Sequence, residues 1–155
     1  MKITSEEPIE HWYFLTPKDK IILDLGCNRF YSSISTAEWF IGEGAKELIG
    51  VDLSLCDFEH PNFINHIDII DSTDKIKKYL QYNPQIIKCD IEGAEIYFDG
   101  IDELPSVEEI AIEYHTELIK PFIERKLNEW GFNKIITYQI FDEDINRIGV
   151  FHAWR

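Results

Sequence analysis

The sequence is short of cysteines, of basic residues and of long apolar runs, and each shortage excludes a class of protein. Its three cysteines, Cys27, Cys56 and Cys89, form no CxxC or CxxH pair. The sequence therefore indicates neither a disulfide framework nor a zinc site, and we expect buried thiols. No apolar run approaches the roughly 20 residues that cross a bilayer, and the polar, acidic N-terminal segment lacks the pattern of a signal peptide. We expect a soluble cytoplasmic protein without membrane contact.

Basic residues are also few. The chain has 15 lysines and arginines against 29 aspartates and glutamates, which gives a net charge of −14. This charge repels a phosphate backbone unless a local basic patch overcomes it, so nucleic acid is a disfavoured partner. Two basic clusters lie on amphipathic helix patterns, where we expect them to form solvated faces. They are Lys75, Lys77 and Lys78 in the first, and Lys120, Arg125 and Lys126 in the second.

Glycine is scarce in the turn that carries the strongest local signal. The segment Asp24–Asn28 follows the apolar run Ile21–Leu23 and leads into a helix-like stretch from Ser32 to Ile41. A strand, a glycine turn and a helix in that order build a nucleotide pocket, but the dinucleotide fingerprint needs three glycines. Gly26 is the single glycine of this turn, so a ligand without a pyrophosphate fits better.

What the sequence does contain is a regular alternation of short apolar runs and helical patterns. Its 155 residues suit one α/β domain, 1–155, whose residues 1–17 form an aromatic-rich leader that acts either as a lid or as a strut packed on the sheet. Two final β-prone runs without a helix between them predict an antiparallel hairpin. We therefore expect a Rossmann-like sheet of seven strands, mostly parallel, with helices on both faces. The expected strands are Ile21–Leu25, Glu47–Leu53, Phe63–Ile67, Gln85–Asp90, Glu108–Tyr114, Lys134–Phe141 and Arg147–Trp154.

Acidic residues collect where the parallel strands end, which is the place where such sheets bind ligands. They are Asp24, Asp52, Asp68, Asp90 with Glu92, and Glu113, which is followed by His115. This set favours a cationic or hydroxyl-rich ligand. Asp52 suits a ribose diol, or else caps a helix at Ser54. Asp24 either lies near the ligand or orders the turn, and Asn28 either lies near the ligand or caps a helix.

A second group of acids follows the fourth strand, where Asp90, Glu92 and Glu95 lie within six residues. Like charges at such spacing need a cation or hydrogen bonds, as in general bases and metal sites, and Lys88 is a candidate cation. A structural ion pair that includes Glu113 is the competing interpretation. His115 is either structural or a base that takes a proton near pH 7. Asp90, Glu92 and His115 together suit a hard cation, but spacing does not separate this from metal-free catalysis, so we assign no metal.

The segments Ile22–Asn28 and Ile87–Glu95, followed by Ile112–His115, resemble the FkbM-type family of class I S-adenosylmethionine-dependent methyltransferases. The resemblance covers roughly residues 20 to 115, and the Lys-x-Asp-x-Glu-Gly-x-Glu pattern is its most characteristic part. Two positions differ from the family pattern: Phe30 stands where a glycine is usual, and Asp52 stands where a glutamate is more common. The family's sheet has the same seven strands and reversed hairpin.

The resemblance implies methyl transfer from S-adenosylmethionine, commonly to a hydroxyl oxygen. It places Asp24, Gly26 and Asn28 around the methionine moiety, Asp52 on the ribose, Ile67 and Asp68 near adenine, and Asp90, Glu92 and His115 at the acceptor. We expect Asp90 or His115 to deprotonate a small-molecule or sugar hydroxyl. The leader, the loop after the fourth strand or a second subunit of a homo-oligomer would complete the pocket. The alternative is a catalytically degenerate fold that serves as a binding or scaffold module.

Overall fold

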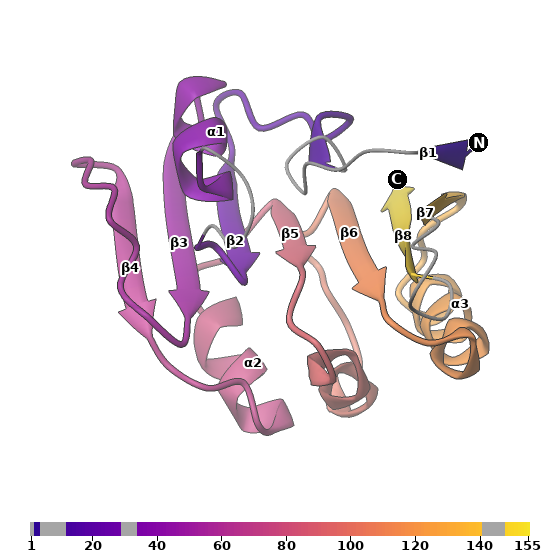
Figure 1. Cartoon of the computed structure of the whole chain (residues 1–155). Coiled ribbons are helices and arrows are strands. Elements are labelled where there is room, and N and C mark those ends of the chain that lie inside the picture. Colours follow the sequence, from indigo (N-terminus) through magenta and orange to yellow (C-terminus); the bar gives the residue numbers. More distant parts are fainter. Residues whose placement is uncertain (1, 4–11, 29–33, 141–147) are drawn as a thin grey trace.

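The computed structural model describes residues 2–3, 12–28, 34–140 and 148–155, which form a mixed sheet with helices around it (Figure 1). The strands are β1 (Lys2–Ile3), β2 (Ile21–Leu25), β3 (Glu47–Asp52), β4 (Phe63–Ile67), β5 (Ile86–Cys89), β6 (Glu109–Tyr114), β7 (Lys134–Ile140) and β8 (Ile148–Trp154). The α-helices are α1 (Thr36–Gly42), α2 (Thr73–Leu80) and α3 (Lys120–Glu129), and the 3-10 helices are η2 (Ala94–Gly100) and η3 (Glu117–Ile119).

The strand order is β1-β7-β8-β6-β5-β2-β3-β4. The strands from β6 to β4 in this order are mutually parallel, and β8 runs antiparallel to both β6 and β7. The expected seven-stranded Rossmann-like sheet with a reversed hairpin is therefore confirmed. Strand β1, which pairs in parallel with β7, adds a short eighth strand that the sequence did not predict.

Apolar side chains cover both faces of this sheet, as nearly continuous apolar strands require. Successive side chains of a strand point to opposite faces, so Ile22 and Leu23 of β2 belong to two different cores. The core around Ile22 receives α1, and the core around Leu23 receives α2, η2 and α3 (Figure 1). The helices contribute Ala37 and Phe40 to the first core, and Ile76, Tyr79, Phe98, Ile123 and Leu127 to the second.

Local signals place the helix starts. Ser35 caps α1 in a reciprocal capping box with Glu38, so the helix begins at Thr36. The helix-like stretch was expected to begin at Ser32, but residues 29–33 lie outside the described part of the chain. Ser72 caps α2, and Pro121 lies in the first turn of α3, where its missing N–H costs no hydrogen bond.

The leader packs on the sheet in the part that the structure describes. Trp12 and Leu15 are buried in the same core as Ile22 and α1, whereas Tyr13 is exposed. This is the strut arrangement that the sequence left open beside a lid. Residues 4–11 of the leader, His11 among them, lie outside the described residues.

The two basic clusters are solvated as the sequence predicted, except at Lys126. Lys126 is buried, and its ammonium donates to the carbonyl oxygens of Asp99 and Ile101. Lys75 and Lys78 of α2 form ion pairs with Asp68. The three cysteines are free and buried, as expected. In the described part of the chain, no helix is long and apolar enough to cross a membrane.

Candidate active site

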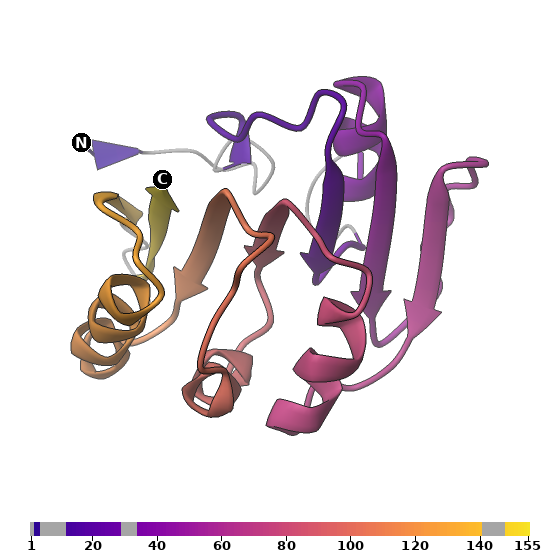
Figure 2. The ribbon, with the colours of Figure 1, turned by 180° about the vertical axis from the view of Figure 1, so that it is seen from behind.

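The carboxyl ends of β2 to β6 lie at one edge of the sheet, because these strands run in the same direction (Figures 1 and 2). The turn after β2 crosses this edge next to the end of β5. Gly26 adopts φ +87°, and a Cβ at this position would lie 2.3 Å from the carbonyl oxygen of Asp90. Only glycine fits there without strain. Phe30 lies outside the described residues, so its departure from the family pattern stays without a structural account.

A buried ion pair holds this turn. Asp24 and Lys88 are cross-strand neighbours on β2 and β5, and their charged groups lie 3.0 Å apart with both side chains fully buried. Thr36 of α1 donates its hydroxyl to the second carboxylate oxygen of Asp24. The Lys88 ammonium also donates to the Gly26 carbonyl oxygen at 2.5 Å. Asp24 therefore has the turn-ordering role that the sequence left open, and both of its carboxylate oxygens bind groups of the protein.

The electrostatics of Lys88 fit this structural role. Burial opposes its charge, but the carboxylates of Asp24 and Asp90 outweigh that effect and raise the pKa of the Lys88 ammonium. The ammonium lies 3.9 Å from Asp90 and 5.0 Å from the centre of the Trp12 ring. Lys88 thus stays charged and connects the turn after β2 with the end of β5.

Asp52 and Asn28 connect the ends of β3 and β2. The Asn28 backbone N–H donates to Asp52 Oδ2 at 3.0 Å, and the Asn28 side-chain amide donates to Ser54 Oγ at 2.8 Å. The Ser54 N–H reaches Asp52 Oδ1 at 3.4 Å, but β3 is followed by β4, so no helix begins at Ser54 for Asp52 to cap. Asp52 is half-buried and keeps a solvent-facing side at the tip of β3.

Large apolar side chains are exposed beside Asp52. Leu53, Ile67 and Ile69 are 69%, 62% and 58% exposed, and Ile67 lies opposite Asp52 in the β3–β4 register. An exposed apolar patch next to polar groups is typical of a ligand-binding surface.

Asp68 is bound to α2. Its carboxylate accepts from Lys75 Nζ at 2.5 Å, Tyr79 Oη at 2.6 Å and Lys78 Nζ at 3.1 Å. These hydrogen bonds, led by that of Lys75, hold the pKa of the Asp68 carboxyl well below its usual range. Its backbone N–H donates to the Asp52 carbonyl oxygen at 3.0 Å, so Asp68 fixes the two strand tips relative to each other.

The ends of β5 and β6 bring a second group of residues together. Side-chain ligand atoms of Asp90, Glu113 and His115 lie within 4.8 Å of one another. His115 Nδ1 lies 3.3 Å from Glu95 Oε1, and His115 Nε2 lies 3.9 Å from Glu113 Oε1. Glu92 is exposed and is not part of this group. The set expected to suit a hard cation was Asp90, Glu92 and His115. In the structure, Glu113 takes the place of Glu92 in this set.

Protonation in this group is uneven. Burial, with a hydrogen bond to Asp90, raises the pKa of Glu113 well above its usual value, which favours its neutral form. Burial opposes the charge of His115, but the hydrogen bond to Glu95 and the charges of Glu95, Asp90 and Glu92 outweigh it and raise the pKa of the imidazole. An ionised carboxylate and a neutral imidazole are the kinds of group here that can accept a proton.

Glu95 and Glu113 were not predicted as site residues. Glu95 was counted in the acidic segment and Glu113 was assigned to a competing ion pair. The signal for Glu113 was the parallel pairing of the fourth and fifth expected strands. Cys89 lies opposite Ile112, so the next residues along each strand, Asp90 and Glu113, end side by side.

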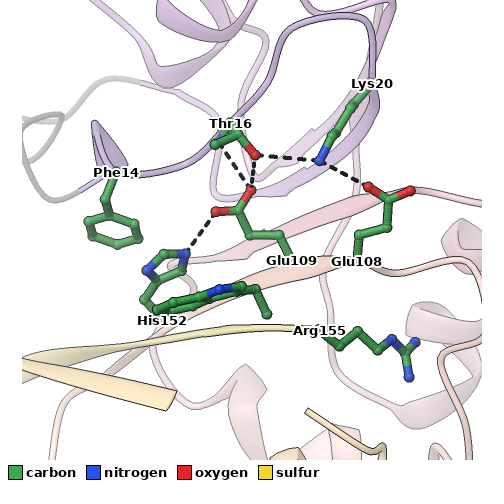
Figure 3. Close-up of a pocket in the computed structure, with 8 residues that line it drawn as sticks. Phe14, Thr16, Lys20, Glu108, Glu109, His152 and Arg155 are labelled. Carbon is green, nitrogen blue, oxygen red and sulfur yellow. Dashed lines mark hydrogen bonds and ion pairs between the residues drawn. The ribbon is translucent and has the colours of Figure 1, made fainter. Parts of the chain in front are cut away.

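A separate polar group lies at the amino end of β6. The buried Glu109 carboxylate binds His152 Nε2 at 2.8 Å and accepts from the Thr16 hydroxyl at 2.6 Å, beside a cavity of about 310 Å³ (Figure 3). Burial opposes the charge of Glu109, but these hydrogen bonds lower its pKa. This group ties the leader to β6 and β8, and it is remote from the strand tips.

No family model matches the sequence, and no curated protein matches it, so the resemblance to the FkbM-type family is not confirmed by sequence comparison. Solved structures do match. The chain is similar to Sp1610 from Streptococcus pneumoniae, described as a tRNA (m1A22) methyltransferase and solved with S-adenosyl-L-methionine. The TM-score is 0.65 at 14% identity, over 98% of this chain and 73% of that one.

Two further structures have the same architecture. A protein from Plasmodium falciparum named as a ribosomal RNA methyltransferase gives a TM-score of 0.57 at 19% identity, over 95% of this chain and 92% of that one. The MycE methyltransferase of the mycinamycin biosynthetic pathway, solved with Mg, SAH and mycinamycin VI, gives 0.57 at 12% identity, over 94% of this chain and 44% of that one. The chain therefore has the Rossmann-like fold of class I S-adenosylmethionine-dependent methyltransferases.

Proposed function

We propose that this protein is an S-adenosylmethionine-dependent methyltransferase that acts on a hydroxyl group of a small molecule or sugar. The observation that carries the proposal is the tip of β3. There, half-buried Asp52 lies between the glycine turn after β2 and the exposed apolar residues Leu53 and Ile67. A nucleoside has a ribose diol, which the acid can bind, and an apolar base, which can lie on the exposed apolar surface beside it.

The residues at this edge fit the cofactor in kind. Asp52 offers carboxylate oxygens to the ribose hydroxyls, and Leu53, Ile67 and Ile69 offer an apolar surface to adenine. Gly26 brings the turn close to the end of β5, and Asn28 follows in the same turn, where we propose that the methionine moiety binds. When bound, S-adenosylmethionine supplies an electrophilic methyl group on a cationic sulfonium, which suits an edge rich in acids and without a phosphate cradle.

The residues at the ends of β5 and β6 then face the acceptor. Asp90 and His115 are the groups that would accept the proton of the acceptor hydroxyl, and both are partly open to solvent. His115 is the base we favour, because the hydrogen bond and charge of Glu95 raise its pKa against the opposing effect of burial. Orientation of the acceptor at these groups would supply much of the acceleration.

Two lines support this proposal beyond the geometry. The similar structures include one solved with S-adenosyl-L-methionine and one with SAH. The Lys88–Glu95 segment has the FkbM-type pattern, and we propose that the chain is a divergent member of that family. Two of the similar structures are named as RNA methyltransferases, but the net charge of −14 and the acids at the strand tips disfavour a phosphate backbone as acceptor here.

Binding of S-adenosylhomocysteine to Asp52→Ala tests the proposal. A lost hydrogen bond to a charged group costs about 1.5–3 kcal/mol, so we expect affinity to fall roughly 10- to 100-fold. Asp52→Asn, which keeps one carbonyl oxygen, should lose less. Asp102→Ala, which removes an exposed acid after η2, is the charge-matched control and should bind like the parent chain. Equal affinity for Asp52→Ala and Asp102→Ala, measured by calorimetry, would contradict the proposed ribose contact.

A further inference from the structure

His115 has a defined partner on each side of its ring. Nδ1 lies 3.3 Å from Glu95 Oε1, and Nε2 lies 3.9 Å from Glu113 Oε1, on the side of the Asp90 carboxylate. Glu95 comes from the first turn of η2, whereas His115 follows the end of β6. The two side chains are therefore positioned by different elements and meet at the acceptor side of the candidate site.

The Glu95 carboxylate is unusual for its burial. The residue is only 4% exposed, and in the described part of the chain its side chain is hydrogen-bonded to His115. A buried carboxylate is costly unless it is paired, so a role in holding His115 accounts for a glutamate at this position.

We propose that Glu95 is a positioning residue for His115. It accepts a hydrogen bond from Nδ1–H, which leaves Nε2 without a proton and directed toward Glu113 and Asp90. The neutral imidazole is then in the tautomer that can take a proton at Nε2, and the imidazolium that forms is stabilised by the Glu95 charge. This inference rests on the proposed function, since it names the atom that receives the proton of the acceptor hydroxyl.

In the described part of the chain, the titratable groups that face the ring are carboxyl groups. Glu95 of η2 lies at Nδ1, and Glu113 of β6 is the neighbour of Nε2. The charges of Glu95, Asp90 and Glu92 favour the protonated imidazole, whereas the hydrogen bond at Nδ1 sets the tautomer of the neutral ring. The Lys88 ammonium meets the group at Asp90, at 3.9 Å.

The test is the titration of His115 followed by NMR, with the His115 signals assigned by their loss in His115→Gln. In the parent chain, long-range proton–nitrogen correlations should show the Nδ1–H tautomer for neutral His115, and the Nε2–H tautomer would overturn the proposal. This measurement needs no variant of Glu95. It also needs no ligand, so failure of S-adenosylhomocysteine to bind would contradict the proposed function and leave this result readable.

The charge of Glu95 is tested by E95Q, which keeps the shape and an oxygen that accepts from Nδ1–H. We expect the pKa of His115 to fall by roughly one unit. The matched control is E92Q, which removes the same charge from an exposed position without a hydrogen bond to the ring, and its shift should be less than half as large. Equal shifts in the two variants, or none in E95Q, would show that Glu95 does not position His115.

Discussion

At the scale of single residues, Lys88 is the side chain on which the site depends most. It neutralises Asp24, holds the carbonyl oxygen of Gly26 and lies 3.9 Å from Asp90. A buried lysine in that position connects the turn after β2 with the acid at the end of β5. Its replacement should therefore change stability first, and the geometry of the site with it.

Lys88→Met removes one partner of a fully buried ion pair. We expect the free energy of unfolding to fall by about 3–5 kcal/mol, because Asp24 is left buried without its cation. Lys77→Met, at an exposed position of α2, should change stability by no more than about 0.5 kcal/mol. Urea unfolding of the two variants measures both values, and a similar small loss in each would mean that the Asp24–Lys88 pair is not important for stability.

Asp68 makes the stability of the fold depend on pH in the acidic range. Its pKa is lower in the folded chain than the usual value of about 3.9, so the ionised form stabilises the fold above that pH, and the stabilisation is lost as pH falls through the folded pKa. The stability difference between the parent chain and Asp68→Asn should therefore be smaller at pH 3 than at pH 6. Asp71→Asn, at an exposed position in the same loop, should show little difference at either pH. A difference in the free energy of unfolding between the parent chain and Asp68→Asn that is larger at pH 3 than at pH 6 would contradict this prediction.

At the scale of elements, the turn after β2 is defined by its contact with the end of β5. Gly26→Ala places a Cβ 2.3 Å from the Asp90 carbonyl oxygen at a φ of +87°. We expect it to cost at least about 1–3 kcal/mol and to weaken binding of S-adenosylhomocysteine.

Gly42 provides the matched control for this turn. A Cβ at Gly42, the last residue of α1, meets nothing within 4 Å, so Gly42→Ala should leave stability unchanged or raise it by up to about 1 kcal/mol. Thermal unfolding of both variants measures the change in stability, and calorimetry measures the change in binding of S-adenosylhomocysteine. Equal behaviour of the two alanines would show that the close approach at Gly26 does not exist in solution.

At the scale of the whole molecule, the sequence predicted the arrangement of elements better than the use of individual side chains. Apolar runs separated by helical patterns predicted seven strands, and parallel strands must present their tips at one edge. The expected bounds of β2 and β4 coincide with the structure, β5 is one residue shorter than expected at each end, and the other expected strands differ by one residue at one end. The two-residue strand β1 carries no pattern of its own, which is why the sequence did not predict it.

The pairing of charges could not be read from spacing. The sequence suggested that Lys88 compensates the acids after the fourth strand or pairs with Glu113, but the β2–β5 register makes Asp24 its direct neighbour. Lys75 and Lys78 lie on the exposed side of an amphipathic pattern, and only the loop between β4 and α2 brings Asp68 to them. The sequence identified Glu95 as one of three neighbouring acids. It did not show its partner, because His115 lies 20 residues away and follows strand β6.

The central claim is that the tips of β2, β3 and β4 bind the nucleoside of S-adenosylmethionine. A crystal structure of the protein soaked with S-adenosylhomocysteine tests it most directly. The account predicts the ribose within hydrogen-bonding distance of Asp52 and the adenine against Leu53 and Ile67. Crystals soaked at millimolar concentration that show no ligand at these tips, or ligand only in the cavity beside Glu109, would contradict it.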